Sequence, residues 1–199
     1  LEAGAVSIVT RDFELAETLA ALGKCPKLVI TDSQIFGKVS KIVPEDIPLT
    51  SFSILMARYK GNLEQNVKGA RALEQLKNGD TVLISEGCTH HRQCNDIGTV
   101  KMPDWIRRFS RKTPEFSFTS GKGFPDDLSS FSLIVHCGAC MLNPQEVSYR
   151  QQLAKTENIP MTNYGIAIAY MNGILRRVLS PFPEPVSYTH LRAHETRSN

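Results

Sequence analysis

The sequence lacks the features of a membrane or secreted protein. No apolar run in its 199 residues approaches the roughly 20 that a membrane-spanning helix needs, so no membrane partner is expected. The opening stretch, LEAGAVSIVT, does not have the basic-then-apolar order of a signal peptide, and this predicts a cytoplasmic location. A net charge of only +3 is too small to indicate nucleic acid as a partner.

Familiar catalytic motifs are missing as well. The sequence has no G-x-x-x-x-G-K-[ST] motif, and the S-G-K-G at residues 120–123 lacks the first glycine of that P-loop pattern. No Ser-His-Asp set and no pair of carboxylates stands out as hydrolytic machinery. We therefore predict that this chain is not an enzyme.

Cysteine is scarce, and its count is odd. The five cysteines are Cys25, Cys88, Cys94, Cys137 and Cys140. An odd number in a chain without a secretory signal argues against a disulfide framework. Reduced thiols that bind a metal are the better interpretation.

The first 45 residues contain two copies of one unit. VSIVT (6–10) and KLVIT (27–31) are typical of short strands, and each precedes a stretch with helical periodicity. A strand–helix–strand–helix order with short connections predicts parallel strands. Two strands cannot cover their own edges, so this unit needs strands from elsewhere in the chain or from a second subunit. PEDIPLTS (44–51) is interpreted as a linker.

Residues 46–183 alternate again between strand-like and helical segments. Strands are predicted at 81–85, around 115–120 and at 133–137, with a further short strand or turn before one last helix. Asn62, three residues before Gln65, and Asn143, three residues before Glu146, are predicted to cap two of the helices. The predicted fold class is therefore α/β, with two small units of two or three layers, mostly parallel sheets and flanking helices. The polar tail 184–199 has no periodicity and is interpreted as non-native, which excludes its two histidines from function.

The cysteines lie at the ends of predicted strands. Cys88 comes just after one buried strand, and Cys137 and Cys140 come just after another. The carboxyl ends of parallel strands form one edge of a sheet, where ligands bind, so we expect these distant motifs to meet. The Gly and Ala between Cys137 and Cys140 allow the loop to turn both sulfurs towards one point.

Several chemistries use a C-x-x-C motif: redox dithiols, zinc sites and iron–sulfur sites. A redox dithiol has no use for the third thiol of Cys88 or for the flanking His90 and His136. Zinc accepts three cysteines and a histidine, and a 4Fe-4S cluster accepts three thiolates; the residue types alone do not separate the two. At the end of a buried strand, His136 is equally well explained as a core histidine.

The same residues resemble a known family. C-T-H at 88–90 and H-C-G-A-C at 136–140, with VPEDIPLTSFSILMARYKG and MTNYGIAIAYMNGIL, are similar to the FeFe-hydrogenase maturation GTPase family HydF. The resemblance extends from about residue 5 to 183. It implies that residues 1–45 are part of a dimerisation domain, that 46–183 are the cluster-binding domain, and that the GTPase domain and its activity are absent.

The resemblance also implies a cofactor and partners. A 4Fe-4S cluster would be held by Cys88, Cys137 and Cys140, with a non-cysteine group in the fourth position. His90 and His136 are candidates for that position or for the surroundings of the ligands. The family implies a homodimeric scaffold that receives a di-iron precursor from two radical-SAM maturases and delivers it to FeFe-hydrogenase. The alternative function is a zinc-stabilised or C-x-x-C dithiol redox domain.

Overall fold

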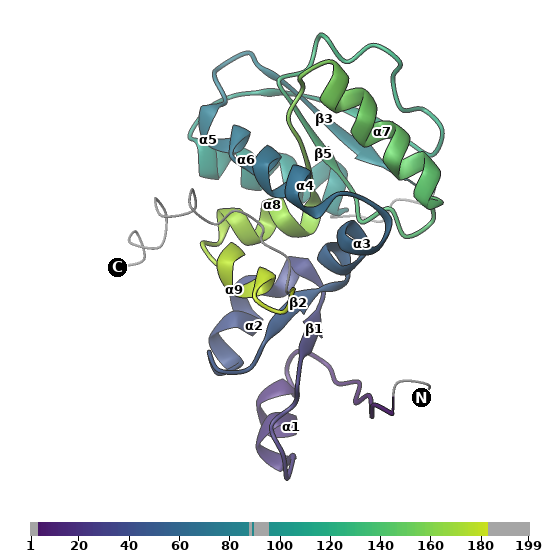
Figure 1. The fold of residues 1–199 in the computed structure, drawn as a ribbon. Helices are drawn as coiled ribbons and strands as arrows, with labels where there is room; N and C mark the ends of the chain where they lie inside the picture. The colour runs from purple at the N-terminus through teal and green to yellow at the C-terminus, as the bar shows by residue number, and fades with distance from the viewer. Residues whose placement is uncertain (1–3, 88, 90–95, 183–199) are drawn as a thin grey trace.

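A computed structural model of the protein describes residues 4–87, 89 and 96–182. It contains two parallel sheets of different size, and so confirms the predicted α/β class (Figure 1). The smaller sheet pairs β1 (Val29–Thr31) with β2 (Leu49–Ser51). The larger sheet has the order β4-β3-β5-β6, and its strands are β3 (Thr81–Glu86), β4 (Glu115–Ser120), β5 (Leu133–His136) and β6 (Met161–Asn163).

Helices surround both sheets. In the N-terminal part these are α1 (Leu15–Ala21), η1 (Ser33–Ile35) and α2 (Phe36–Ile42). The helices that follow β2 are α3 (Phe52–Lys60), α4 (Leu63–Ala70), α5 (Ala72–Gln75), η2 (Ile97–Lys101), α6 (Met102–Ser110), α7 (Pro144–Thr156), α8 (Tyr164–Met171) and α9 (Leu175–Leu179). Among the described residues, no helix has the length and apolar character needed to cross a membrane.

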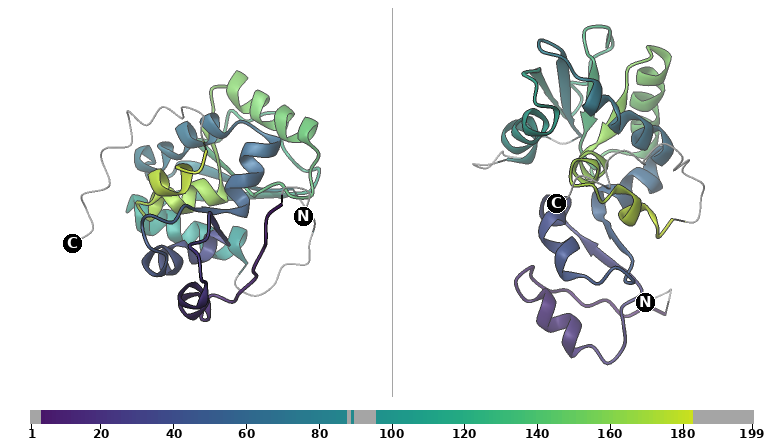
Figure 2. Two further views of the ribbon diagram at one scale, coloured as in Figure 1. Left: turned by 60° about the horizontal axis from the view of Figure 1, so that its bottom comes forward. Right: turned by 90° about the vertical axis from the view of Figure 1, so that its left-hand side faces the viewer.

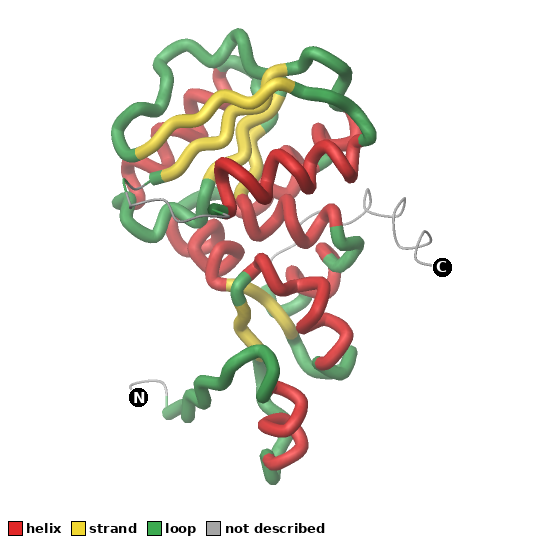
Figure 3. The backbone as a smooth tube through the Cα atoms, turned by 180° about the vertical axis from the view of Figure 1, so that it is seen from behind, coloured by secondary structure: helices red, strands yellow, loops and turns green. Residues whose placement is uncertain are grey.

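Three strands of the larger sheet, β3, β5 and β6, are buried on both faces, while β4 is a partly exposed edge strand. Successive strand residues point to opposite faces, so Val82 and Ile84 join one core cluster while Leu83 joins another. The first face packs on α4, α5, α6 and α8, and the second packs on α7 and the loop before β5. Figure 3 shows the sheet between these layers. Continuous apolar strands are what two covered faces require.

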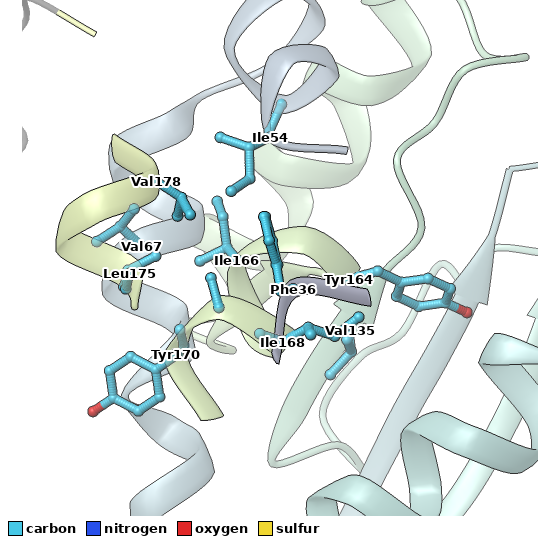
Figure 4. Close-up of a cluster of buried hydrophobic side chains, with 14 of the residues drawn as sticks. Phe36, Ile54, Val67, Val135, Tyr164, Ile166, Ile168, Tyr170, Leu175 and Val178 are labelled. Carbon is cyan, nitrogen blue, oxygen red and sulfur yellow. The ribbon is translucent and has the colours of Figure 1, made fainter. Parts of the chain in front are cut away.

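The smaller sheet shares the main core rather than having one of its own. Phe36 of α2 packs with Ile54 of α3, Val135 of β5, Ile166 of α8 and Val178 of α9 (Figure 4). Each of these side chains is essentially removed from solvent. The α2–β2 region is therefore anchored to the larger unit, while α1 projects at the end far from the four-stranded sheet (Figures 1 and 2).

Three local predictions were wrong. Residues 6–10 form no strand: Val6 and Val9 are about nine-tenths exposed, because no described strand of this chain lies beside them. The predicted linker 44–51 contains β2, whose Leu49 pairs with Val29. The predicted last helix is two, α8 and α9, because Gly173 between them adopts a left-handed conformation with φ 70°.

Candidate metal centre

The strand order creates a topological switch point between β3 and β5. The connection from β3 to β4 carries α6 on one face of the sheet, and the connection from β5 to β6 carries α7 on the other. The chain therefore leaves the two central strands in opposite directions. In open parallel sheets, ligands bind outside the carboxyl ends of the strands at such a point. The H-C-G-A-C segment begins there.

The loops after β3 and β5 are in direct contact at this switch point. Ser85 pairs with His136, and the Cys137 amide donates to the Ser85 carbonyl at 2.8 Å. Beyond the strands, the Gly87 amide lies 3.1 Å from Cys137 Sγ. A Cβ added to Gly87 would lie 2.7 Å from Leu142 Cγ, so any larger residue here would force the Leu142 side chain to shift.

The sulfur of Cys137 is held by backbone N–H donors. It accepts from Gly87 N at 3.1 Å and from Ala139 N at 3.3 Å. Ala139 reaches this position with φ 55°, a left-handed conformation that few non-glycine residues adopt. Hydrogen bonds to a sulfur favour its ionised form, which is the form that binds metal. Cys137 is half-buried, Cys140 is exposed, and neither is in a disulfide.

Lys60 holds the loop that carries both cysteines. This last residue of α3 donates from Nζ to three backbone carbonyls, those of Ala139 (3.1 Å), Cys140 (2.7 Å) and Leu142 (2.9 Å). An ammonium group has three donors, so each is used. The loop then leads into α7, whose predicted cap is confirmed: Asn143 Oδ1 accepts from the Glu146 amide at 2.8 Å.

His136 lies on the α7 face of the sheet with both ring nitrogens engaged. It is 3% exposed. Arg150 Nη1 can only donate, so it donates to His136 Nε2 at 3.0 Å. The proton is then on Nδ1, which donates to the Cys137 carbonyl at 2.9 Å. Burial lowers the pKa of His136 to about 4, with the Arg150 charge acting in the same direction against the Cys137 hydrogen bond, so the ring is neutral.

Arg150 connects four parts of the site and is itself 1% exposed. Its Nε pairs with Glu146 at 2.8 Å, and its Nη2 donates to the Gly121 carbonyl at 2.7 Å. The guanidinium lies 4.9 Å from the centre of the Phe124 ring. The sequence analysis missed this residue. The spacing of Glu146 and Arg150 on one helix predicts their ion pair, but it does not predict that Arg150 is buried.

An acidic group also lies at this edge. Tyr164 Oη donates to Glu86 Oε1 at 3.5 Å. Burial raises the pKa of Tyr164 well above its usual value, and the negative charges of Glu86, Cys137 and Asp96 raise it further. Tyr164 therefore stays protonated and can only be a neutral donor here. Sequence reasoning missed this pair, because 78 residues separate its members.

The C-T-H segment is described only at its middle residue. Thr89 lies against Gly121, where an added Cβ would be 2.8 Å from Thr89 Cγ2. Cys88 and His90 of the predicted ligand set, and also His91 and Cys94, lie outside the described residues. Within the described part of the chain, no three His, Cys, Asp or Glu side chains gather to hold a metal ion. Cys25 is exposed, in the N-terminal part.

Comparison with known families accounts for nearly the whole chain. Residues 64–181 match the Hydrogen maturase F tetramerization domain, and residues 1–61 match the Hydrogen maturase F dimerization domain. The chain belongs to the HydF family. This agrees with the resemblance carried by the cysteine and histidine motifs. No curated protein matches the chain.

HydF membership places the chain in the maturation of FeFe-hydrogenase, and its two domains are homo-oligomerization domains. No GTPase domain is found in it. The two matches meet between residues 61 and 64, at the turn from α3 to α4, whereas the sequence analysis drew the boundary at residue 45. In HydF terms, α3 ends the dimerization domain, and its Lys60 reaches the C-x-x-C loop of the tetramerization domain.

Proposed function

We propose that this chain is a non-enzymatic scaffold that binds a 4Fe-4S cluster through Cys88, Cys137 and Cys140. It would carry a di-iron precursor for FeFe-hydrogenase. The observation that carries the proposal is the hydrogen bond from Gly87 N to Cys137 Sγ at the switch point of the sheet. Cys88 is the next residue after Gly87, and this neighbourhood supports the proposal that the two cysteine motifs serve one site.

The donor set suits an iron–sulfur cluster. Three thiolates at one edge hold three of the four irons of a cube and leave the fourth for another group. Amides that donate to the Cys137 sulfur are the hydrogen bonds that adjust a cluster's reduction potential. The pocket next to Cys137 measures about 20 Å³, room for one water and too small for a cluster.

The two candidate histidines take different roles in this proposal. His136 uses both ring nitrogens within the protein, so it supports the Cys137 carbonyl instead of binding iron. His90 follows Thr89, which lies beside Gly121 next to the Arg150 network, and it remains the protein candidate for the fourth position. An exchangeable group there suits a carrier that must release its cargo.

The partners follow from the family. The dimerization and tetramerization matches support a homo-oligomer, with the N-terminal part forming the dimer. As a HydF protein, the chain would receive its precursor from two radical-SAM maturases and deliver it to FeFe-hydrogenase. It would hydrolyse no GTP itself.

Metal analysis of the full chain tests the proposal. Purified and reconstituted without oxygen, it should hold about four iron and four sulfide per chain, with an EPR signal after reduction. Added imidazole or cyanide should alter that signal by binding the open iron. About one zinc per chain without sulfide would instead support the zinc-stabilised alternative.

Single cysteine replacements test the ligand set. Cys137→Ala should abolish cluster binding, because it removes a ligand and the acceptor of two amides. Cys94→Ala should leave most of it, since Cys94 is outside both motifs. Cys25→Ala is the matched control, as this thiol lies in the N-terminal part. Iron content and EPR intensity are the measurements, and a dependence on Cys94 instead of Cys137 would contradict the ligand set.

A further inference from the structure

Lys60 is placed unusually for a lysine at the end of a helix. Among the described residues, its ammonium group donates neither to a carboxylate nor to its own helix. Its three hydrogen bonds all go to backbone carbonyls between Cys137 and α7. These acceptors are 79 to 82 residues away along the chain. Three donors matched to three carbonyls make a complete set, since no donor is left over.

The loop depends on this support because it has little of its own. Between Cys137 and Asn143, the backbone pairs with itself through the Leu142 amide and the Ala139 carbonyl at 3.1 Å. Ala139 is left-handed, a conformation that persists only where the surroundings hold it. Lys60 bonds the same Ala139 carbonyl and the carbonyl of Cys140. It thus fixes the loop between the two cysteines and immediately beyond.

Helix α3 fixes the position of Lys60 in turn. At the start of the helix, Ser53 lies beside the loop: an added Cβ on Gly138 would be 3.4 Å from Ser53 Cα. Ser53 Oγ also accepts from the Gly165 amide at 3.0 Å, and its carbonyl accepts from Asn163 Nδ2 at 2.8 Å. Both ends of α3 therefore contact the H-C-G-A-C segment, and the lysine projects from a rigid support.

We propose that Lys60 is a positioning residue of the cluster site: it holds the C-x-x-C loop in its ligating shape and places a positive charge on the backbone of that loop. This inference rests on the proposed function. The Lys60 ammonium is 2.7 Å from the carbonyl oxygen of Cys140, whose sulfur belongs to the same residue. A positive charge on the ligand loop favours the reduced cluster, which carries one more negative charge.

The test compares Lys60→Met with the unchanged full chain. Met keeps an apolar stem and removes both the donors and the charge. In the cluster-free protein, hydrogen exchange at the Ala139 and Leu142 amides should become faster. In the loaded protein, loss of iron to a chelator should be about 10- to 100-fold faster, as for other residues that support metal ligands. The reduction potential should become more negative.

Lys60→Arg separates the charge from the geometry. Arginine keeps the positive charge, but its planar fork does not reproduce three divergent donors. Its reduction potential should remain near that of the unchanged chain, while loop exchange is still faster. A merely structural lysine would alter exchange and leave the potential alone in both variants, and that result would overturn the charge part of the inference.

Two controls match the test. Lys68→Met removes an exposed lysine of α4 that pairs with Glu64, and it should alter neither loop exchange nor potential. Arg177→Met removes a comparable clamp elsewhere, on the carbonyls of Ser40, Val43 and Pro44. It should lower stability without changing the potential. If Lys60→Met does not fold by circular dichroism, Lys60→Gln, with two donors and no charge, takes its place.

The outcomes separate this inference from the proposed function. If the unchanged chain binds no iron–sulfur cluster, the proposed function fails and this inference fails with it. If the unchanged chain binds the cluster and the Lys60 variants match it in exchange, iron loss and potential, only the inference is overturned.

Discussion

The described part of the protein contains two parallel sheets, and the chain covers one of them more completely than the other. In the four-stranded sheet, β3 and β5 are central, and both faces are packed under helices. In the two-stranded sheet, Ile30 of β1 is 41% exposed, and the segment before α1 leaves Val6, Val9 and Phe13 largely in solvent. Apolar strand-like sequence is present in both regions. Only in the larger one are all of these segments paired within the described chain.

This difference shows what a strand needs besides apolar residues. KLVIT became β1 because β2 lies beside it, whereas VSIVT has no described neighbour and stays irregular. A strand edge without a partner is a site for pairing with another chain. The match of residues 1–61 to a dimerization domain fits this, since a second subunit can supply the missing cover.

The largest expected effect comes from Gly69→Ala in the larger unit. Gly69 of α4 lies against β6, and an added Cβ would collide with the Met161 carbonyl group, 2.5 Å from its carbon. The neighbour is backbone and cannot turn aside, so we expect a loss of about 3 kcal/mol in the free energy of unfolding. Urea unfolding followed by circular dichroism measures it.

The matched control is Gly23→Ala in the N-terminal part. An added Cβ there meets nothing within 4 Å. The free energy of unfolding should change by less than about 0.5 kcal/mol. Equal effects of the two substitutions would show that the N-terminal part is packed as closely as the larger unit, and would contradict the difference between them.

An intermediate effect is expected from Val9→Asp, which tests whether a second subunit covers the N-terminal segment. Val9 is 94% exposed, so the charge should not disturb the fold of one chain. Burying such a side chain is worth about 1.5–3 kcal/mol, so its loss should raise the dimer dissociation constant about tenfold or more. Light scattering over a concentration series gives that constant.

Glu45→Gln is the control for this change, because Glu45 is exposed on the same unit but is not apolar. It should leave the dissociation constant unchanged. An unaltered constant for Val9→Asp would place the dimer contact elsewhere, and a monomeric unchanged chain at micromolar concentration would remove the dimer altogether.

The smallest effect is expected from Asp12→Asn, again in the N-terminal part. Asp12 Oδ2 pairs with Lys38 Nζ at 2.8 Å, and both side chains are more than a third exposed. The hydrogen bond from Lys38 lowers the pKa of Asp12 below 3.8. The stabilisation is therefore present above pH 3.8 and is lost as the pH falls through the lowered pKa.

Because exposed ion pairs contribute little, the melting temperature near neutral pH should change only marginally. Thermal melts of Asp12→Asn and of the unchanged chain, from neutral pH to below pH 3.8, measure the difference in melting temperature between them. This difference should vanish at the acid end. A difference that grows with acid would mean that Asp12 is not stabilised by Lys38.

Local signals predicted the elements around the site well. The Asn143 cap of α7 and the Asn62 cap of α4 are confirmed, because a cap involves residues three apart. The strand before H-C-G-A-C is also confirmed, because its continuous apolar run is again a local signal. The predicted meeting of the motifs is supported at Gly87 and Cys137, while the ligand set itself stays a prediction.

The hydrogen-bond partners of the site residues could not be predicted from the sequence. Lys60 and the carbonyls that it binds are 79 to 82 positions apart, and nothing in α3 distinguishes this lysine from a solvated one. His136 was interpreted equally as a ligand or as a core histidine. Its tautomer depends on Arg150, which only the packing of α7 on the sheet brings to it.

By itself, the sequence determined the central strands of the larger sheet, the helix caps and the C-x-x-C spacing, because these depend on residues that are neighbours along the chain. Only the tertiary structure decided the strand order, and with it the switch point between β3 and β5 where Gly87 meets Cys137. The reason is physical: which strands become neighbours is settled by how two faces of apolar side chains are buried together, and that is a property of the whole core.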